Sequence, residues 1–448
     1  MADMPKKTER VVRAINCLTL YRNIFDEPVL RTFRELLDLI LEEDLSAVSK
    51  YHVLIGMLIE LKREDTVAEL DIFKNHLLDI TLSIENAFSL ASEQFEYEEI
   101  DELCVRAVEN DLRLLKLVYD FDLIAIGDFV AGNYDMGEFT PRLGKLSAGY
   151  PKSAGYPAYY FQEKTRLKRS FVYSTNWSDN IRDLHGFYRK TGSGVFGRYW
   201  AFKWNGNSEL SGLSGVANPD PIRLDDLVGY ESQKQEILRN TGQFVKGFSA
   251  NNMLLYGDRG TGKSSTIKSL IHIFGAEGLR IIEVSKHDLL CLHHIVASVE
   301  GRAQKFIIFI DDLSFEEDET EYKDLKALLE GSINKPPANV LVYATSNRRN
   351  LVREYFSDRD GDEVGRQDTY EEKLSLADRF GIKLVYSAQN KQEYLSTVED
   401  MAVKSGIIME KDELHELALR WVLWHNARSG RTARQFIDDL KGRLDIHR

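Results

Sequence analysis

Apolar residues recur at helical spacing through the first third of the chain, with charged residues between them. Similar patterns cover residues 53–61 and 112–118, and few glycines or prolines interrupt them. No heptad repeat persists, which favours a bundle with its own core over a long coiled coil. Residues 1–135 are therefore predicted to form an all-α N-terminal domain. The residues that share one face of its clearest helix are Val29, Leu30, Phe33, Leu36, Leu37, Ile40 and Leu41.

The pattern changes between residues 136 and 217, which we interpret as an aromatic-rich connector and linker. A Gly-Tyr-Pro near-repeat at 149–157 precedes a small basic cluster at 164–169. Aromatic and basic side chains together can bind single-stranded nucleic acid, but the acidic chain favours an irregular connector. Alternating aromatic residues at 200–204 predict a short strand. The Gly-, Ser- and Asn-rich segment 205–216 is interpreted as the main linker.

Continuous apolar runs separated by helical stretches predict a parallel sheet covered on both faces, within an α/β domain at residues 218–388. A helix is expected from about residue 231 to 244. From residue 389 to 448 helical spacing returns, which predicts a small helical lid. The expected strands are Met253–Tyr256, Leu279–Val284, Lys305–Ile310, Val340–Thr345 and Ile382–Tyr386.

The first of these strands leads into a glycine-rich loop that fits G-x-x-x-x-G-K-[ST] and precedes a helical stretch. Its glycines allow the backbone to approach a phosphate, and loop amides and the positive helix end hold anionic oxygens. Lys263 is expected to reach the β- and γ-phosphates of ATP, and Ser264 to place its hydroxyl on Mg²⁺. A glycine turn without a ligand is the alternative. The nucleotide-binding residues predicted from this loop are Gly257, Asp258, Arg259, Gly260, Thr261, Gly262, Lys263, Ser264 and Ser265.

Two carboxylates, Asp311 and Asp312, follow the apolar strand that ends at residue 310. Ligands of parallel α/β sheets bind at the carboxyl ends of the strands. Asp311 is predicted to position Mg²⁺, and Asp312 to polarise the attacking water. Glu316 and Glu317 are nearby alternatives for the second role. Asn347, which follows the next strand, is expected to reach the γ-phosphate or the same water.

Chain length, net charge and cysteine content limit the domain count, the kinds of partner and the cellular compartment that are expected. The 448 residues suffice for two to four domains. A net charge of -13 argues against a surface that coats nucleic acid in general, although a local patch remains open. Three widely separated cysteines indicate reduced thiols in the cytoplasm. With no apolar run of membrane-spanning length and no signal-peptide pattern, no membrane partner is expected.

Three other segments resemble known sites without matching them. Residues 390–393 resemble a guanine-reading Asn-Lys-x-Asp, but Glu replaces the Asp, and ATP is favoured. Residues 358–362 resemble a calcium loop, but Thr369 stands where the loop needs Glu. Residues 291–294 contain one Cys and two His, without a second ligand pair at zinc spacing.

Taken together, these segments resemble the AAA+ ATPases, and most closely the DUF815 family. The resemblance is strong over residues 218–448 and weak over the first 130 residues. It implies ATP binding and hydrolysis, and says little about the substrate. The matching phrases are Pro-Asp-Pro-Ile-Arg-Leu (219–224), the loop 251–265, Asp-Asp-Leu-Ser-Phe-Glu (311–316), Tyr-Ala-Thr-Ser-Asn-Arg-Arg (343–349), Glu-Lys-Leu-Ser-Leu-Ala-Asp-Arg-Phe-Gly (372–381) and Ser-Gly-Arg-Thr-Ala-Arg-Gln-Phe (429–436).

The resemblance also implies roles for single residues. Asn347 resembles the sensor-1 residue. Arg434 resembles the sensor-2 arginine that ties the lid to the γ-phosphate, with Arg431 as the alternative. Val228 and Gly229 resemble the segment beside adenine.

Arg379 resembles the arginine finger, which acts on the nucleotide of a neighbouring subunit; a surface ion pair with Asp378 or another neighbour is the alternative. The family implies self-association into a ring and turnover that remodels a partner. Two other readings stay open: an ATP-controlled assembly switch of helicase-loader type acting with nucleic acid, and an ATP-organised scaffold. The N-terminal domain could bind a protein partner.

Overall fold

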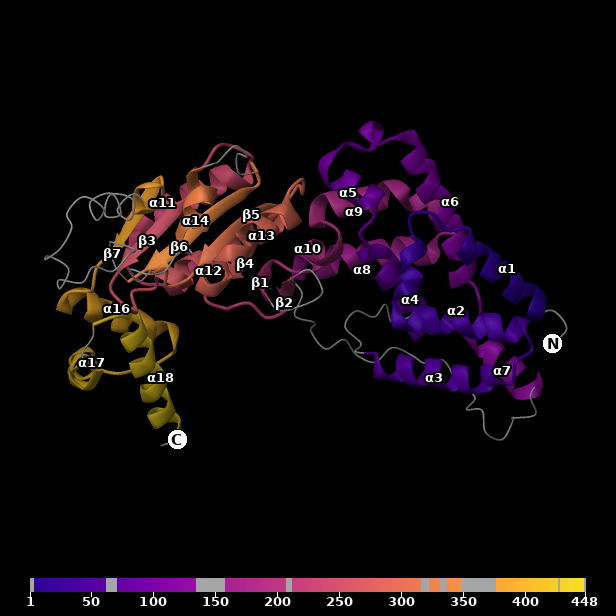
Figure 1. Cartoon of the computed structure of the whole chain (residues 1–448). Coiled ribbons are helices and arrows are strands. Elements are labelled where there is room, and N and C mark those ends of the chain that lie inside the picture. The colour runs from indigo at the N-terminus through magenta and orange to yellow at the C-terminus, as the bar shows by residue number, and fades with distance from the viewer. Residues whose placement is uncertain are drawn as a thin grey trace, which may run out of the picture. The chain divides into compact units, whose positions relative to one another are not determined.

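The computed structural model describes residues 4–61, 71–133, 158–206, 212–315, 322–330, 337–347, 376–425 and 428–446. Its contacts divide the chain into two compact units, Met1–Tyr199 and Trp200–Arg448, each with its own core. The first is all-α and the second contains the sheet (Figure 1). The predicted fold class is therefore confirmed: an α/β phosphate-loop domain with a helical lid, and an all-α N-terminal domain.

Amphipathic helices build the N-terminal unit. Helix α2 begins at Pro28, which suits the first helical position, and Glu27 caps it by accepting from the Leu30 amide at 3.0 Å. Most of its apolar face is buried, as at Phe33 and Leu36. The helices of the unit are α1 Met4–Asn16, α2 Pro28–Leu41, α3 Ser46–Glu60, α4 Ile72–Ser83, α5 Ala87–Gln94, α6 Glu102–Tyr119, α7 Leu123–Asn133, α8 Ala158–Tyr173, α9 Ile181–Thr191 and α10 Gly194–Arg198.

The structure corrects the expectation of an irregular connector. Its described part contains α8, α9 and α10, and Phe171, Trp177 and Leu184 lie in the same core as α2. Residues 213–216 of the expected linker form strand β2. The Gly-Tyr-Pro repeat, which lies outside the described residues, had suggested irregular structure, whereas the apolar residues after it bury at helical spacing.

Part of the basic cluster is buried. The Lys164 and Lys168 side chains on α8 are 3% and 1% exposed, and each ammonium lies 2.5 Å from Oδ1 of Asp79 on α4. Lys168 also donates to the Asn75 side chain at 3.1 Å. Burial alone would raise the pKa of Asp79, but the two ammonium groups outweigh it and lower that pKa. These lysines therefore hold α8 against α4 and are not available to a nucleic acid.

Asp79→Ala is expected to destabilise the N-terminal unit by about 3–5 kcal/mol, because it removes the carboxylate that pairs with two buried ammonium groups. The matched control is Glu102→Ala, which removes an exposed pair with Arg106 and should cost less than about 1 kcal/mol. Hydrogen exchange of α4 and α8 peptides along a urea titration measures both. Equal effects of the two substitutions would contradict the structural role of the buried cluster.

The C-terminal unit is organised around a seven-stranded sheet of order β2-β1-β4-β5-β6-β3-β7. All neighbours pair in parallel except β1 and β2, which form an antiparallel edge. The chain leaves β3 toward one side of the sheet and reaches β7 on the other, so the order reverses at β3. A ligand of such a sheet binds at that point. The strands are β1 Ala201–Trp204, β2 Leu213–Val216, β3 Met253–Gly257, β4 Leu279–Val284, β5 Lys305–Ile310, β6 Val340–Ser346 and β7 Ile382–Tyr386.

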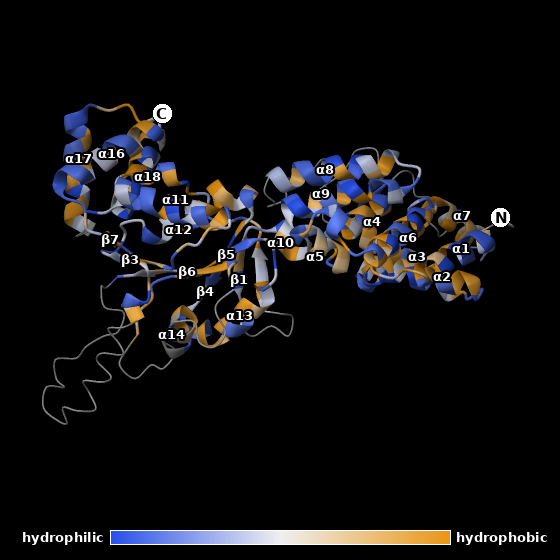
Figure 2. Cartoon of the chain, turned by 90° about the horizontal axis from the view of Figure 1, so that it is seen from above, coloured by the Kyte–Doolittle hydropathy of each residue, from blue (hydrophilic) through white to orange (hydrophobic). Residues whose placement is uncertain are grey.

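Helices cover both faces of this sheet, as its continuously apolar strands predict. Helices α11 (Glu231–Val245) and α12 (Lys263–Phe274) lie on one side, and α13 (Leu292–Val299) and α14 (Tyr322–Glu330) on the other (Figure 2). Ile237 and Ile267 share a core with Leu255 of β3 and Phe309 of β5, all fully buried. The five strands expected from the sequence are confirmed to within two residues.

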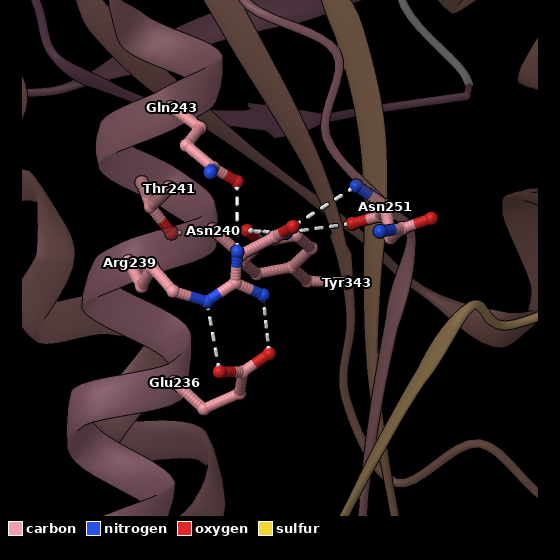
Figure 3. A network of polar contacts seen from close by, with 7 residues as sticks. All are labelled: Glu236, Arg239, Asn240, Thr241, Gln243, Asn251 and Tyr343. Atoms are coloured by element: carbon pink, nitrogen blue, oxygen red, sulfur yellow. Dashed lines mark hydrogen bonds and ion pairs between the residues drawn. The ribbon is translucent and has the colours of Figure 1, made fainter.

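A buried polar network fixes α11 to the sheet at the start of β3. The Tyr343 hydroxyl of β6 lies 3.0 Å from Asn240 Nδ2 and 2.9 Å from Thr241 Oγ1 (Figure 3). The Asn240 side chain also makes two hydrogen bonds to the Asn251 backbone, just before β3. Burial raises the pKa of Tyr343 to about 12, so the hydroxyl stays neutral in this network. The network holds the start of β3 in register with β6.

Three helices, α16 Lys391–Lys404, α17 Lys411–His425 and α18 Gly430–Ile446, form the predicted lid. They pack around a small core that includes Tyr394, Val398, Ala418 and Phe436. The predicted boundary between residues 388 and 389 falls in the segment between β7 and α16.

Candidate functional site

The glycine loop passes directly from β3 into α12. Gly257 has φ 138°, and a Cβ atom there would lie 2.1 Å from the carbonyl oxygen of Tyr386 on β7. Gly262 has φ 94° and immediately precedes Lys263, the first residue of α12. Side chains are excluded at the first position and strained at the second, so the sequence needs glycine at both. The loop therefore brings bare backbone to a helix N-terminus, where anions bind.

Lys263 is held by its own loop and by the neighbouring strand. Its ammonium donates to the carbonyl oxygens of Gly257 at 2.9 Å and Asp258 at 2.7 Å, and to Oδ1 of Asn347 at 3.1 Å. Burial lowers the pKa of Lys263, while nearby carboxylates, that of Asp312 first, act in the opposite direction. The structure thus brings the predicted lysine and the predicted amide into direct contact.

Asp311 receives three hydrogen bonds on one carboxylate oxygen. Ser264 Oγ and Thr345 Oγ1 each lie 2.6 Å from its Oδ1, and the Asp312 amide lies 3.2 Å away. A serine hydroxyl beside a carboxylate offers the oxygen ligands that Mg²⁺ prefers. Mg²⁺ takes its other ligands from phosphates and water, so the Ser264 hydroxyl and the Asp311 carboxylate fit such an ion.

Thr345 is a site residue that the sequence analysis missed. Its hydroxyl donates to the Asp311 carboxylate and accepts from the Asp312 backbone amide at 2.9 Å, so it contacts both acidic residues. Thr345 lies near the end of β6, two residues before Asn347, which directly follows the strand. A hydroxyl close to this strand end was the available signal.

Asp312 has an uncommon backbone conformation. Its φ is 51°, in the left-handed region that aspartate and asparagine tolerate better than most residues. The side chain is fixed by Asn347, whose Nδ2 lies 2.5 Å from Asp312 Oδ1. The chain therefore turns sharply after β5 and holds this carboxylate against the end of β6. Glu316 and Glu317, the alternatives for its role, lie outside the described residues.

A cavity of about 600 Å³ opens over these groups, at the carboxyl ends of β3, β5 and β6. One wall is polar and contains the loop residues from Arg259 to Ser265. The cavity is also lined by apolar and aromatic side chains, those of Ile222, Leu227, Val228, Tyr230 and Met401. Of the predicted site residues, those that line the cavity are Val228, Arg259, Gly260, Thr261, Gly262, Lys263, Ser264, Ser265, Asp311, Asp312, Asn347 and Arg434.

The lid closes one side of this cavity. Arg431 and Arg434 both line it from the first turns of α18. The Arg431 amide donates to the carbonyl oxygen of Gly260 at 3.2 Å, and its charge opposes protonation of Lys263. Both arginines are exposed, so the geometry keeps both as candidates for the lid contact.

Three predicted residues lie just outside the cavity wall, and one lies elsewhere. Gly229 follows Val228 with φ 84°, and Gly257 and Asp258 form the start of the loop. Asp258 accepts from the Ala388 amide at 2.6 Å, which ties the loop to the segment before the lid. Arg379 is exposed just before β7 and does not line this cavity.

The resemblance of residues 390–393 to a guanine-reading motif has a structural explanation. Asn390 caps α16 by accepting from the amides of Gln392 and Glu393, each at 2.9 Å. The Glu393 carboxylate in turn accepts from the Asn390 amide at 2.8 Å, which completes a capping box. The calcium-like segment 358–362 lies outside the described residues, and the Cys291 thiol is free.

Comparison with known proteins places this site in a family. The sequence model described as "Protein of unknown function (DUF815)" matches residues 197–444, more than half of the chain. The chain belongs to the DUF815 family. The match contains the sheet, the phosphate loop and the lid of this DUF815 protein.

Other similarities are more distant. The large subunit of replication factor C from Nanoarchaeum equitans (strain Kin4-M) is 31% identical over 97 residues, which are 21% of this chain and 23% of that protein. The Thermotoga maritima RuvB Holliday junction branch migration motor aligns with a TM-score of 0.31 and 17% identity, over 49% of this chain and 72% of that one.

The FIGL-1 AAA domain in complex with ADP aligns with a TM-score of 0.31 and 18% identity, over 44% of this chain and 66% of that one.

This DUF815 protein spans less than a quarter of the length of the replication factor C subunit that it matches. None of the helices within the described ranges is long and apolar enough to cross a membrane.

Proposed function

We propose that this protein is a cytoplasmic ATPase that binds ATP with Mg²⁺ in the cavity of the C-terminal unit and hydrolyses it. One observation carries the proposal. Lys263 and Ser264 of the phosphate loop form a single hydrogen-bonded cluster with Asp311, Asp312 and Asn347 from the two strands beyond β3. Phosphate-binding, metal-binding and water-polarising groups thus meet at the point where the strand order reverses.

Each residue of the cluster has a proposed task. The loop backbone and Lys263 bind the phosphates, and Ser264 and Asp311 hold the metal ion. Bound there, Mg²⁺ would neutralise charge on the phosphate oxygens. Asp312 orients the attacking water and accepts its proton, while Asn347 keeps that carboxylate in place.

We further propose that each ATP site lies at the interface between two subunits of a ring, and that the neighbouring subunit supplies Arg379 to it. Its exposed position away from the cavity of its own chain supports this arrangement. Turnover would then remodel a macromolecular partner, and the all-α N-terminal unit is the proposed module for binding it.

Asp312→Asn is expected to bind ATP with nearly unchanged affinity and to lose turnover by roughly 10²–10⁴-fold, the usual contribution of a general base. Asparagine tolerates the same φ and can still accept from Asn347, so the fold should persist. Binding by calorimetry and phosphate release by a coupled assay separate the two effects. Asp412→Asn, an exposed aspartate of α17, is the matched control.

Wild-type turnover in the Asp312→Asn variant would show that the general base is Glu316 or another residue, and not Asp312. The same assay with and without single-stranded DNA tests a second candidate function, ATP-controlled assembly on nucleic acid, which the match to a replication factor C subunit favours. Stimulation by DNA would support that function over the remodelling of a protein.

A further inference from the structure

The side chain of Gln389 is a buried polar group in the wall of the nucleotide cavity. It lies between β7 and α16, lines the cavity, and is 7% exposed. Its Nε2 donates to Thr397 Oγ1 at 3.0 Å, whereas its Oε1 has no hydrogen-bond partner within the described part of the chain. A buried acceptor without a donor is costly, and such a group calls for an explanation.

The hydrogen bonds around Thr397 fix which way the amide points. The Thr397 hydroxyl donates its one proton to the carbonyl oxygen of Glu393 at 2.9 Å. It can therefore only accept from Gln389, which places the amide nitrogen toward Thr397 and leaves the oxygen on the other side. Turning the amide over would set two acceptors against each other or break the bond to Glu393.

The cavity itself shows where a base would lie. Phosphates belong at the loop and the start of α12, so the apolar side chains of Val228 and Met401 in the same lining are left for a flat aromatic ring. Gln389 lies beside Val228, because a Cβ atom on the next residue, Gly229, would lie 3.8 Å from its Nε2.

We infer that Gln389 selects the base: its Oε1 accepts a hydrogen bond from the exocyclic amine of a 6-aminopurine. This inference rests on the proposed nucleotide-binding function and adds its specificity. A 6-oxopurine would place a carbonyl oxygen against Oε1, and both groups are acceptors. Thr397 acts through Gln389 as a positioning residue, since it holds the amide in the selective orientation.

Equilibrium binding of ATP and of inosine triphosphate, which carries the 6-oxo group, tests this directly on the full chain. ATP should bind more tightly by roughly 10- to 100-fold, as expected when a hydrogen bond is lost and a buried acceptor meets another acceptor. Purine riboside triphosphate, which has neither group at position 6, should fall between the two. This ranking needs no substitution and is independent of any folding defect.

Two variants assign the effect to Gln389. Gln389→Leu should lower the affinity for ATP and leave the affinity for inosine triphosphate nearly unchanged, so that the two affinities become similar. Thr397→Val should reduce the preference while retaining most of the affinity for ATP. Gln392→Leu, which changes an exposed glutamine one turn away, should keep the wild-type preference.

The outcomes separate this inference from the function on which it rests. If neither triphosphate binds to the wild-type protein, the proposed function itself is wrong. If ATP binds tightly but inosine triphosphate binds as well, or if Gln389→Leu keeps the preference, the nucleotide function stands and the base-reading role of Gln389 is refuted.

Discussion

Lys263→Ala is expected to raise the dissociation constant for ATP by roughly 30-fold to several thousand-fold. Removing one partner of a buried, hydrogen-bonded charge pair costs about 2–5 kcal/mol, and each 1.4 kcal/mol is about tenfold in affinity. Lys263 lies at the start of α12 within reach of the loop carbonyls and Asn347. When a triphosphate binds here, the Lys263 ammonium would donate to phosphate oxygens, which are stronger acceptors than the carbonyl and amide oxygens that it now contacts.

The fold should survive this substitution. Lys263 gives up bonds to two carbonyl oxygens and one side-chain amide, while the apolar face of α12 beneath it, with Ile267 and Leu270, stays buried. Lys268→Ala is the matched control, because Lys268 lies on the same helix and pairs with Glu283 outside the cavity. Calorimetric titration with ATP and thermal unfolding test both variants. Unchanged affinity in a folded Lys263→Ala protein would refute the phosphate contact.

The sheet and its loop were predictable because their signals are local. A continuous apolar strand followed by a glycine loop specifies its own backbone, and Gly257 and Gly262 take positive φ where the motif places them. The carboxylates at 311 and 312 were placed by a general rule, since parallel strands end at one edge. The contact between Asp312 and Asn347, which follows β6, agrees with that adjacency.

What the sequence did not predict depends on contacts between distant segments. In sequence, Lys164 and Lys168 belong to a basic cluster of the kind that can bind nucleic acid, whereas in the fold both pair with Asp79 of α4, which is distant in sequence. Thr345 and Gln389 are ordinary residues in sequence, and gain their importance only from partners in the folded chain. The Gly and Ser content of residues 213–216 predicted a linker, but these residues form strand β2 because they pair with β1. That pairing is a tertiary contact, which the local composition does not show.

Arg379→Ala is expected to keep ATP binding and to lose turnover by roughly 10³-fold or more, the contribution of arginine fingers in related phosphoryl transfers. The residue is exposed before β7 and lies outside the cavity of its own chain. A guanidinium supplied by a neighbour would neutralise charge that develops only during transfer, so binding and chemistry should separate. Arg420→Ala, which removes an exposed arginine paired with Glu416, is the control.

If Arg379 acts between subunits, two further results are expected. Specific activity should rise with protein concentration, since a heterologous interface must close into a ring before any site is complete. Mixing Arg379→Ala with Lys263→Ala should also recover part of the activity that each lacks. The first variant supplies an intact phosphate loop and the second an intact finger, so some mixed interfaces contain both. A mixture as inactive as its components, or a monomer with full activity, would show that Arg379 does not act between subunits and would favour the switch or the scaffold over the ring ATPase.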